Sequence, residues 1–435
     1  MNDTTFTECP SGPSSWSIAS QWLDPGAQSA PWWKLIGSQL CLLAQEARYP
    51  MEKQFEIILF LYAKVLPRVG PLHKGGKLNS PSRYTSLLTD DGTPFEYSWK
   101  WNSSISSPEI RYCIEAIGSQ TGSPADPYNY LETEKLLTQD LTPCVPGLDL
   151  TWFHHFVKAF GIDQRQVASD NPNAPKASMF VAFEHVLKGV VVKAYFLPSA
   201  EAGSGGPPTF ETFASAARGV LTNVAALDAA LNNVKNNAMG IDLVPDMLAV
   251  DCVDPTKSRL KLYASSTATS FASIVSVMTL GGKISDIDRG IKELELLLRL
   301  VLGRETPLSW DDELEVHGVF DKGLAHDFDL YERITYYFDI APSSKLPDVK
   351  LYIPVIRFGR SDAAVASGIG QYLRLRQRDQ FHDGFVRALG AIGAGRLEES
   401  GHRLQTYLAV AFQRDGSLAI TSYINPGVYH DDLKG

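Results

Sequence analysis

The chain has 435 residues, of which 44% are hydrophobic and 20% charged, and its formal net charge is −9. This composition is typical of a globular protein with a sizeable core, and the net negative charge argues against nucleic acid as a partner. Five cysteines are scattered without metal-ligand spacing, which predicts reduced thiols in a cytoplasmic protein. Because no signal peptide and no apolar run of membrane-spanning length are visible, we expect no membrane partner.

Along the chain, predicted helices alternate with pairs of short strands. Residues 1–15 are rich in Ser, Thr, Pro and Gly, which predicts a flexible tail ahead of a single domain over 16–435. Apolar spacing predicts helices over 31–44, 52–66, 130–137, 150–159, 210–235, 270–280, 286–302, 363–375 and 381–389. Alternation predicts strands over 86–89, 95–101, 110–116, 179–183, 190–197, 247–253, 259–265, 334–340, 349–358, 407–413 and 418–425.

The predicted strand pairs are joined by short turns, such as 188–189, 254–257 and 414–416, whereas 202–208 is predicted to be a loop. Short turns make the strands of each pair antiparallel, so the fold class is α+β with five blocks of helices and strand pairs. Closing ten strands into a barrel ringed by helices would protect their edges. An open sandwich is the alternative arrangement.

The stretch 258–263 has an unusual polar face. If it is a strand, Arg259, Lys261 and Tyr263 point to one side, and leucines point to the other. Related patterns recur about 70 to 90 residues apart, which indicates an internal repeat with a shared polar interior. The recurring residues are Arg111, Lys193, Tyr195, Lys350, Tyr352 and Tyr423.

A barrel lined by these basic residues needs an anion to neutralise them, because buried like charges are unfavourable. A diphosphate is a suitable counter-ion for Lys and Arg. Interleaved tyrosines would stabilise a carbocation formed as diphosphate leaves, and they would exclude water. The alternative is that these strand faces are solvated, with exposed lysines and tyrosines that only fill space.

Glu96 is the candidate catalytic residue, within the stretch Gly92-Thr-Pro94-Phe95-Glu96. Alternation leaves open whether Glu96 points into the barrel or into solvent. If it points inward, it is a carboxylate in an aromatic interior that can accept a hydrogen bond or a proton from an NH or OH group. No metal site is predicted, because the acidic pairs do not extend to a DDxxD array.

Several motifs together resemble the fungal dimethylallyltryptophan synthase family of aromatic prenyltransferases, from the Trp32-Trp33 helix to Tyr423. The most specific are Gly92-x-Pro94-x-Glu96, Lys193-Ala-Tyr195-Phe196, Ala249-Val-Asp251-Cys252 leading into 258–263, and Lys350-Leu-Tyr352. The resemblance implies five αββα repeats in a ten-stranded prenyltransferase barrel. It also implies that dimethylallyl diphosphate binds inside and that no metal or other cofactor is obligatory.

The resemblance also assigns roles to individual residues. Glu96 would hydrogen-bond an indole NH, and Leu87, Leu88 and Tyr407 would contact the acceptor. The diphosphate would be held by Arg111, Lys193, Arg259, Lys261 and Lys350. The allyl cation would be shielded by Tyr195, Tyr263, Tyr352 and Tyr423.

Departures from the family pattern concern the acceptor. The Arg that anchors the carboxylate of free tryptophan is missing from 244–247, and Leu197 replaces a tyrosine. Neither Met179 nor Phe180 can replace the lysine credited with removing the ring proton, and Ala419 stands where many members carry Tyr. These differences favour a tryptophan-containing cyclic dipeptide or another indole alkaloid over a free amino acid.

We therefore expect a monomeric or homodimeric enzyme that transfers dimethylallyl to an indole-containing acceptor by electrophilic aromatic substitution. Two alternatives remain at this point. The acceptor could be a non-indole aromatic, such as a phenol, quinolone or xanthone. The barrel could also be a non-catalytic carrier of isoprenoid diphosphate, although a carrier has no need of a glutamate on its inner wall.

Overall fold

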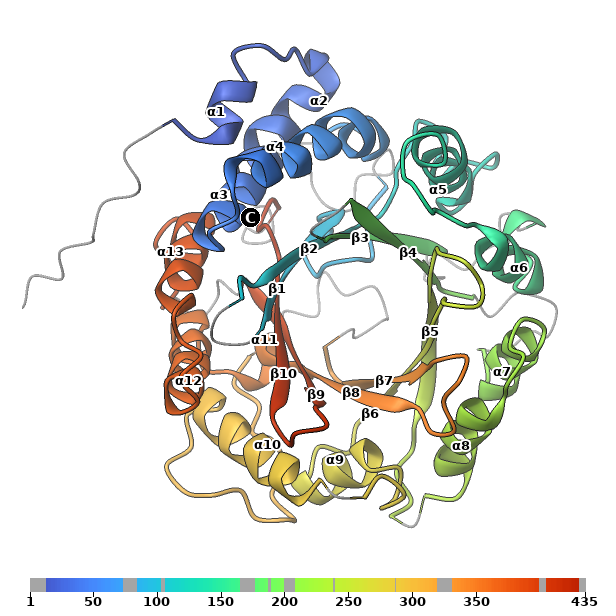
Figure 1. Cartoon of the computed structure of the whole chain (residues 1–435), viewed down its shortest axis with the longest axis vertical. Coiled ribbons are helices and arrows are strands. Elements are labelled where there is room, and N and C mark those ends of the chain that lie inside the picture. The colour runs from blue at the N-terminus through green and yellow to red at the C-terminus, as the bar shows by residue number, and fades with distance from the viewer. Residues whose placement is uncertain are drawn as a thin grey trace, which may run out of the picture.

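In the computed structural model, ten strands form a closed antiparallel barrel surrounded by helices (Figure 1). The structure describes residues 13–72, 84–102, 106–164, 177–186, 189–198, 208–237, 239–285, 287–318, 331–398 and 404–429. Residues 1–12 of the predicted tail, residue 188 of a predicted turn and residues 202–207 of the predicted loop lie outside these ranges. In the described ranges, every helix is too short or too polar to cross a membrane.

Each strand pairs with its neighbours in the chain, and the pairing of β1 with β10 closes the barrel. The strands are β1 (Phe95–Trp101), β2 (Glu109–Ile114), β3 (Met179–His185), β4 (Val190–Phe196), β5 (Val244–Asp251), β6 (Leu260–Ser266), β7 (Ile334–Ile340), β8 (Asp348–Pro354), β9 (Gln405–Phe412) and β10 (Leu418–Ile424). The predicted closed barrel is confirmed, and the open sandwich is excluded.

Helices precede each of the five strand pairs, as the alternating blocks of the sequence predict (Figure 1). Before β1 lie α1 (Ser15–Ala19), α2 (Gly26–Trp32), η1 (Trp33–Gly37), α3 (Ser38–Glu46), α4 (Met51–Phe60), η2 (Leu61–Val65) and η3 (Leu66–Arg68). Before β3 lie α5 (Tyr130–Glu134), η4 (Lys135–Leu141), α6 (Thr151–Ala159) and η5 (Ile162–Gln164). The later groups are α7 (Phe210–Arg218) and α8 (Ala225–Lys235), then α9 (Phe271–Met278) and α10 (Asp288–Val301), and finally α11 (Val355–Phe358), α12 (Asp362–Leu375) and α13 (His382–Ile392).

The main hydrophobic core lies between the outer face of the barrel and the helices. In β1, Phe95, Tyr97, Trp99 and Trp101 all belong to this core, because alternate residues of a strand point to the same face. Glu96, between Phe95 and Tyr97, is consequently directed into the barrel, which settles the question that alternation alone left open. On the helix side, apolar residues at helical spacing in α10 bury the facing stripe of that helix.

Three predicted elements differ from the elements that the structure shows. Residues 86–89 do not form a strand, because the side-chain oxygens of Glu115 accept hydrogen bonds from the hydroxyl of Ser86 and the amide of Leu87. The predicted helix 210–235 is two helices, α7 and α8, separated by residues 219–224. The predicted strand 349–358 ends at Pro354, after which the chain turns into α11.

Candidate active site

The barrel interior is ordered along its axis, because all even-numbered strands run in one direction and all odd-numbered strands run in the other. On three even-numbered strands a lysine precedes a tyrosine by two residues on the inner face, a step of roughly 7 Å along the strand. A layer of basic side chains therefore adjoins a layer of aromatic rings. The three pairs are Lys193 and Tyr195 on β4, Lys261 and Tyr263 on β6, and Lys350 and Tyr352 on β8.

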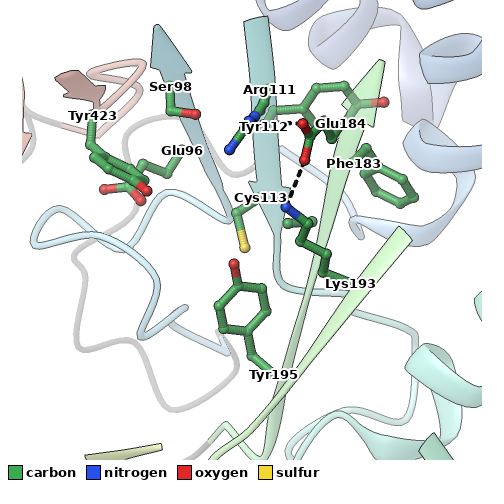
Figure 2. A pocket seen from close by; sticks show the side chains of 11 residues that line it. Glu96, Ser98, Arg111, Tyr112, Cys113, Phe183, Glu184, Lys193, Tyr195 and Tyr423 are labelled. Atoms are coloured by element: carbon green, nitrogen blue, oxygen red, sulfur yellow. Dashed lines mark hydrogen bonds and ion pairs between the residues drawn. The ribbon is translucent and has the colours of Figure 1, made fainter. Parts of the chain in front are cut away.

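Carboxylates on neighbouring strands pair with most of the basic residues. Glu184 lies 2.7 Å from Arg111 and 2.6 Å from Lys193, measured between side-chain oxygen and nitrogen atoms (Figure 2). Burial would raise the pKa of Glu184, but the charges of Lys193 and Arg111 outweigh it and lower the pKa to about 2. Asp251 lies 2.7 Å from the Nζ atom of Lys261. These pairs hold the basic side chains in place on the inner wall.

Arg259 completes the basic layer at the start of β6 and contacts Asp339, a residue of β7. Asp339 is almost fully buried, and one of its carboxylate oxygens has no hydrogen-bond partner among the described residues. Burial raises the pKa of Asp339 against the opposing charges of Lys261 and Arg259.

Lys350 differs from the other basic residues, because it forms no ion pair with a carboxylate of the described residues. Its Nζ atom lies 5.4 Å from the ring centroid of Tyr352 and 5.9 Å from that of Tyr337. It also donates a 3.4 Å hydrogen bond to Thr421. Burial lowers the pKa of Lys350 well below its ordinary value, and the charges of Arg111 and other basic residues lower it further. An anion bound beside Lys350 would stabilise its charged form.

The tyrosines form a packed cluster inside the barrel. The ring centroid of Tyr263 lies 6.1 Å from that of Tyr195 and 6.0 Å from that of Tyr352, whose hydroxyl is 3.2 Å from that of Tyr423. Tyr337 belongs to the same cluster, with its ring 5.2 Å from Tyr263. The four tyrosines predicted from the sequence are therefore brought together, and Tyr337 is a fifth that the sequence pattern missed.

Glu96 projects into the barrel close to the aromatic cluster. Gly92 begins its approach with φ = +77°, a conformation that favours glycine, and Pro94 then leads into β1. The hydroxyl of Thr406 donates a 2.8 Å hydrogen bond to the Glu96 carboxylate. Burial raises the pKa of Glu96 to about 8, with a further contribution from the charge of Asp90, although the hydrogen bond from Thr406 lowers it. Burial consequently favours the protonated form of Glu96.

A pocket of about 380 Å³, including its open mouth, connects Glu96 with the basic layer. Its walls include Glu96, Arg111, Lys193, Tyr195 and Tyr423 (Figure 2). The structure therefore joins the predicted catalytic residue, two predicted diphosphate ligands and two predicted shielding tyrosines in one cavity.

The predicted acceptor residues are not among those that line this cavity, but they pack next to the aromatic cluster or next to lining residues. Tyr407 on β9 has its ring 6.1 Å from that of Tyr352, next to the aromatic cluster. Leu87 and Leu88 pack in a smaller cluster that also contains Cys113 and Tyr195, and both of these line the pocket. All predicted site residues thus lie inside the barrel or at its wall.

The positions that depart from the family pattern also have defined locations. Met179 is fully buried in the core outside the barrel, whereas Phe180 packs against Leu87. Asp246 lies at a β-bulge in β5 and accepts a 2.9 Å hydrogen bond from Ser265. Burial raises the pKa of Asp246 to about 6. A carboxyl group therefore stands in the region where an arginine would bind the carboxylate of free tryptophan.

The sequence patterns do not identify the counter-charges Glu184, Asp251 and Asp339, nor Tyr337 and Thr406. The first four each face a predicted site residue across the sheet, but the sequence carries no signal for this, because each pairing joins strands of different predicted pairs and its register is set only in the assembled barrel. Asp251 pairs with Lys193, Asp339 with Lys261, Tyr337 with Tyr263, and Glu184 with Arg111. Thr406 offers no signal either.

Comparison with known proteins agrees with this architecture. Residues 28–388 match the family model described as tryptophan dimethylallyltransferase. The DMATS-type prenyltransferase fscG of Fusarium equiseti is 88% identical over the full length of both chains. Xanthone prenyltransferase B of Emericella nidulans is 34% identical over 99% of this chain and 95% of that protein.

Solved structures share the fold at lower sequence identity. The crystal structure of AnaPT from Neosartorya fischeri has a TM-score of 0.76 and 21% identity, covering 95% of this chain and 98% of AnaPT. NotF, solved in complex with brevianamide F and DMSPP, has a TM-score of 0.74 and 20% identity, covering 95% of this chain and 99% of NotF. Together with the family match, these likenesses show that the chain belongs to the dimethylallyltryptophan synthase family and is an aromatic prenyltransferase.

Proposed function

We propose that this prenyltransferase transfers a dimethylallyl group from dimethylallyl diphosphate to an indole-containing acceptor, without an obligatory metal ion. The observation that carries the proposal is the order of groups inside the barrel. Basic side chains lie toward one end, five tyrosines follow, and Glu96 lines the same pocket as Arg111 and Lys193. This order matches a reaction that separates diphosphate from an allyl cation and directs the cation toward an electron-rich ring.

In the first step, the bond between C1 of the dimethylallyl group and the diphosphate oxygen breaks, and its electron pair leaves with the diphosphate. Arg111, Lys193, Arg259, Lys261 and Lys350 would stabilise the diphosphate as its negative charge grows. The faces of Tyr195, Tyr263, Tyr352 and Tyr423 would stabilise the allyl cation and exclude water. The basic side chains thereby supply the charge that a metal ion would otherwise contribute.

In the second step, a ring carbon of the acceptor attacks the allyl cation, and the ring then loses a proton. The ionised form of Glu96 would accept a hydrogen bond from the indole NH and raise the nucleophilicity of the ring. Leu87, Leu88 and Tyr407 would hold the acceptor against Glu96. Because Met179 and Phe180 have no basic group, we assign removal of the ring proton to the released diphosphate, held beside the cluster by the basic layer.

A non-indole aromatic acceptor is the second candidate. It is favoured by the names of two relatives, xanthone prenyltransferases B and A, which are 34% and 33% identical to this chain. Glu96 would then face a phenolic hydroxyl or a lactam NH, and the chemistry of the donor would be unchanged. Asp246 argues against a free amino acid in both cases, because an acidic side chain would repel the carboxylate of the acceptor.

The decisive experiment is an acceptor panel with dimethylallyl diphosphate, in the presence and absence of EDTA, with product structures determined by NMR. The panel contains tryptophan, tryptophan-containing cyclic dipeptides, a simple indole, a phenol, a quinolone and a hydroxyxanthone. We expect prenylated indole products whose yield does not change with EDTA. Exclusive prenylation of the xanthone would support the second candidate, and donor binding without any product would support a carrier.

We also expect the enzyme to act in the cytoplasm as a monomer or homodimer.

A further inference from the structure

Residues 84–94 form neither helix nor strand, yet two of them, Leu87 and Leu88, pack in one cluster with residues that line the pocket. Leu87 is 7% exposed and packs with Phe180, in the same cluster as Leu88, Cys113 and Tyr195. Cys113 and Tyr195 line the pocket beside Glu96. Because no strand ladder holds this segment, other groups must bind its backbone polar atoms.

Glu115 binds the polar groups of the first part of segment 84–94, next to Leu87 and Leu88. It follows Arg111 and Cys113 at two-residue spacing, directly beyond the end of β2, and its side chain is completely buried. The carboxylate accepts hydrogen bonds from the hydroxyl of Tyr84, from the hydroxyl of Ser86 at 2.7 Å and from the amide of Leu87 at 2.9 Å. Three donors from four consecutive residues thus converge on one buried carboxylate.

A second buried carboxylate, Asp91, holds the other end of the segment. It accepts hydrogen bonds from the amide of Thr93 at 3.0 Å, from the side chain of Asn425 at 3.1 Å and from the amide of Tyr429 at 3.0 Å. This attachment links the segment to the chain that follows β10. Residues 84–94 are consequently fastened at both ends, with the leucines next to the attachment made by Glu115.

We propose that Glu115 is a positioning residue that fixes Leu87 and Leu88 as a wall of the acceptor pocket and thereby determines the affinity for the acceptor. This inference rests on the proposed function. The carboxylate is suited to the task because both of its oxygens accept hydrogen bonds, and all three surrounding groups are donors. In Glu115→Gln one oxygen becomes an NH₂ group, so the hydroxyl that faces it would have to accept instead of donate, and all three contacts would lose the strength that the charged carboxylate gives them.

The experiment compares Glu115→Gln with a matched control, Glu293→Gln. Glu293 is also a buried carboxylate that accepts a tyrosine hydroxyl, from Tyr372 at 2.8 Å, and two hydrogen bonds from Arg376, but it lies in α10 of the helix layer. The acceptor probes are a tryptophan-containing cyclic dipeptide and a hydroxyxanthone. The readouts are the KM for each probe, the KM for dimethylallyl diphosphate, and hydrogen exchange at the Leu87 amide. Assays are run at pH 8, above the pKa of about 7 that burial gives Glu115.

We expect Glu115→Gln to raise the acceptor KM at least tenfold, to leave the donor KM within twofold, and to accelerate hydrogen exchange at Leu87 at least tenfold. Glu293→Gln should lower Tm without changing either KM or this exchange rate. Ser86→Ala removes one donor from the segment and should shift the same readouts less, so it replaces Glu115→Gln if that variant does not fold.

Unchanged exchange at Leu87 would overturn the proposal, and so would faster exchange with an unchanged acceptor KM. An equal rise in both KM values would also overturn it, because this would show a general loss of the barrel structure. If the wild-type enzyme forms no product with either probe, the proposed function fails. Hydrogen exchange would then decide by itself whether Glu115 holds the segment.

Discussion

Replacing Glu96 by glutamine should lower activity and raise stability, because the site holds this carboxyl group in an unfavourable environment. The substituted amide would keep the shape of the side chain and its hydrogen bond from Thr406. It cannot carry the negative charge that makes the acceptor ring more nucleophilic. We therefore expect turnover to fall by about 10²-fold or more, the usual contribution of a positioned acid or base, while the KM for dimethylallyl diphosphate stays within a few-fold.

The effect on stability follows from the pKa of Glu96, which burial raises from 4.5 to about 8. Between pH 4.5 and 8 the carboxyl group of Glu96 stays protonated in the folded protein, whereas it is ionised in the unfolded chain. The contribution of Glu96 to stability is therefore complete below pH 4.5 and is lost as the pH rises to 8. A shift of this size corresponds to at most roughly 5 kcal/mol. Water in the pocket screens part of it, so we expect Glu96→Gln to stabilise the protein by roughly 1–3 kcal/mol above pH 8.

Two assays check this pair of effects. Thermal unfolding of wild type and variant is compared at two pH values. At pH 4.5 the two Tm values should be nearly equal, and at pH 8.5 the variant should have the clearly higher Tm. Product formation is measured from pH 6 to pH 9. For wild type, kcat/KM for the acceptor should rise toward pH 8 as Glu96 ionises, whereas the variant should lack this rise.

Two results would refute the reasoning. Full activity in Glu96→Gln would remove the carboxylate from the mechanism. A loss of Tm at pH 8.5 would show that ionised Glu96 is stabilised by contacts that outweigh its burial, and the raised pKa would then be wrong.

The remaining predictions concern the donor site. Lys261→Met should raise the KM for dimethylallyl diphosphate about 100-fold and destabilise the fold by roughly 3 kcal/mol or less, because Asp251 would lose its 2.7 Å partner and keep only the 3.9 Å ion pair with Arg259. Adding Asp251→Asn should restore most of the stability in denaturant unfolding without restoring donor affinity. Lys350→Met should weaken donor binding about tenfold in calorimetry. It should leave stability unchanged or higher, since Lys350 has no carboxylate partner among the described residues. A loss of stability would contradict the lowered pKa of Lys350. EDTA should not change turnover with the preferred acceptor, and recovery only after Mg²⁺ is added would disprove the proposed metal independence.

The sequence alone predicted paired antiparallel strands and the basic residues that share their faces, and it favoured a closed barrel over an open sandwich. The strands and their shared faces both depend on alternation within single strands, which is a local property. Lys261 and Tyr263 share a face wherever β6 lies, and the recurrence of this pattern on β4 and β8 required a common interior. Short turns between the strands of a pair then made the arrangement antiparallel. The errors include 86–89, 210–235 and 349–358, where side-chain hydrogen bonds or turns replaced the regular element, and Ser15, which was placed in the flexible tail but lies buried in α1.

The tertiary structure decided the relations between strands that are distant in the chain. Thr406 lies 310 residues after Glu96, and no local pattern could predict that its hydroxyl binds this carboxylate. The same holds for Asp339, which the register of β6 and β7 brings opposite Lys261. Whether Glu96 faces the interior was also undecided until the aromatic residues around it were seen packed against the helices. Its raised pKa is a consequence of that burial, and burial is a property of the assembled barrel.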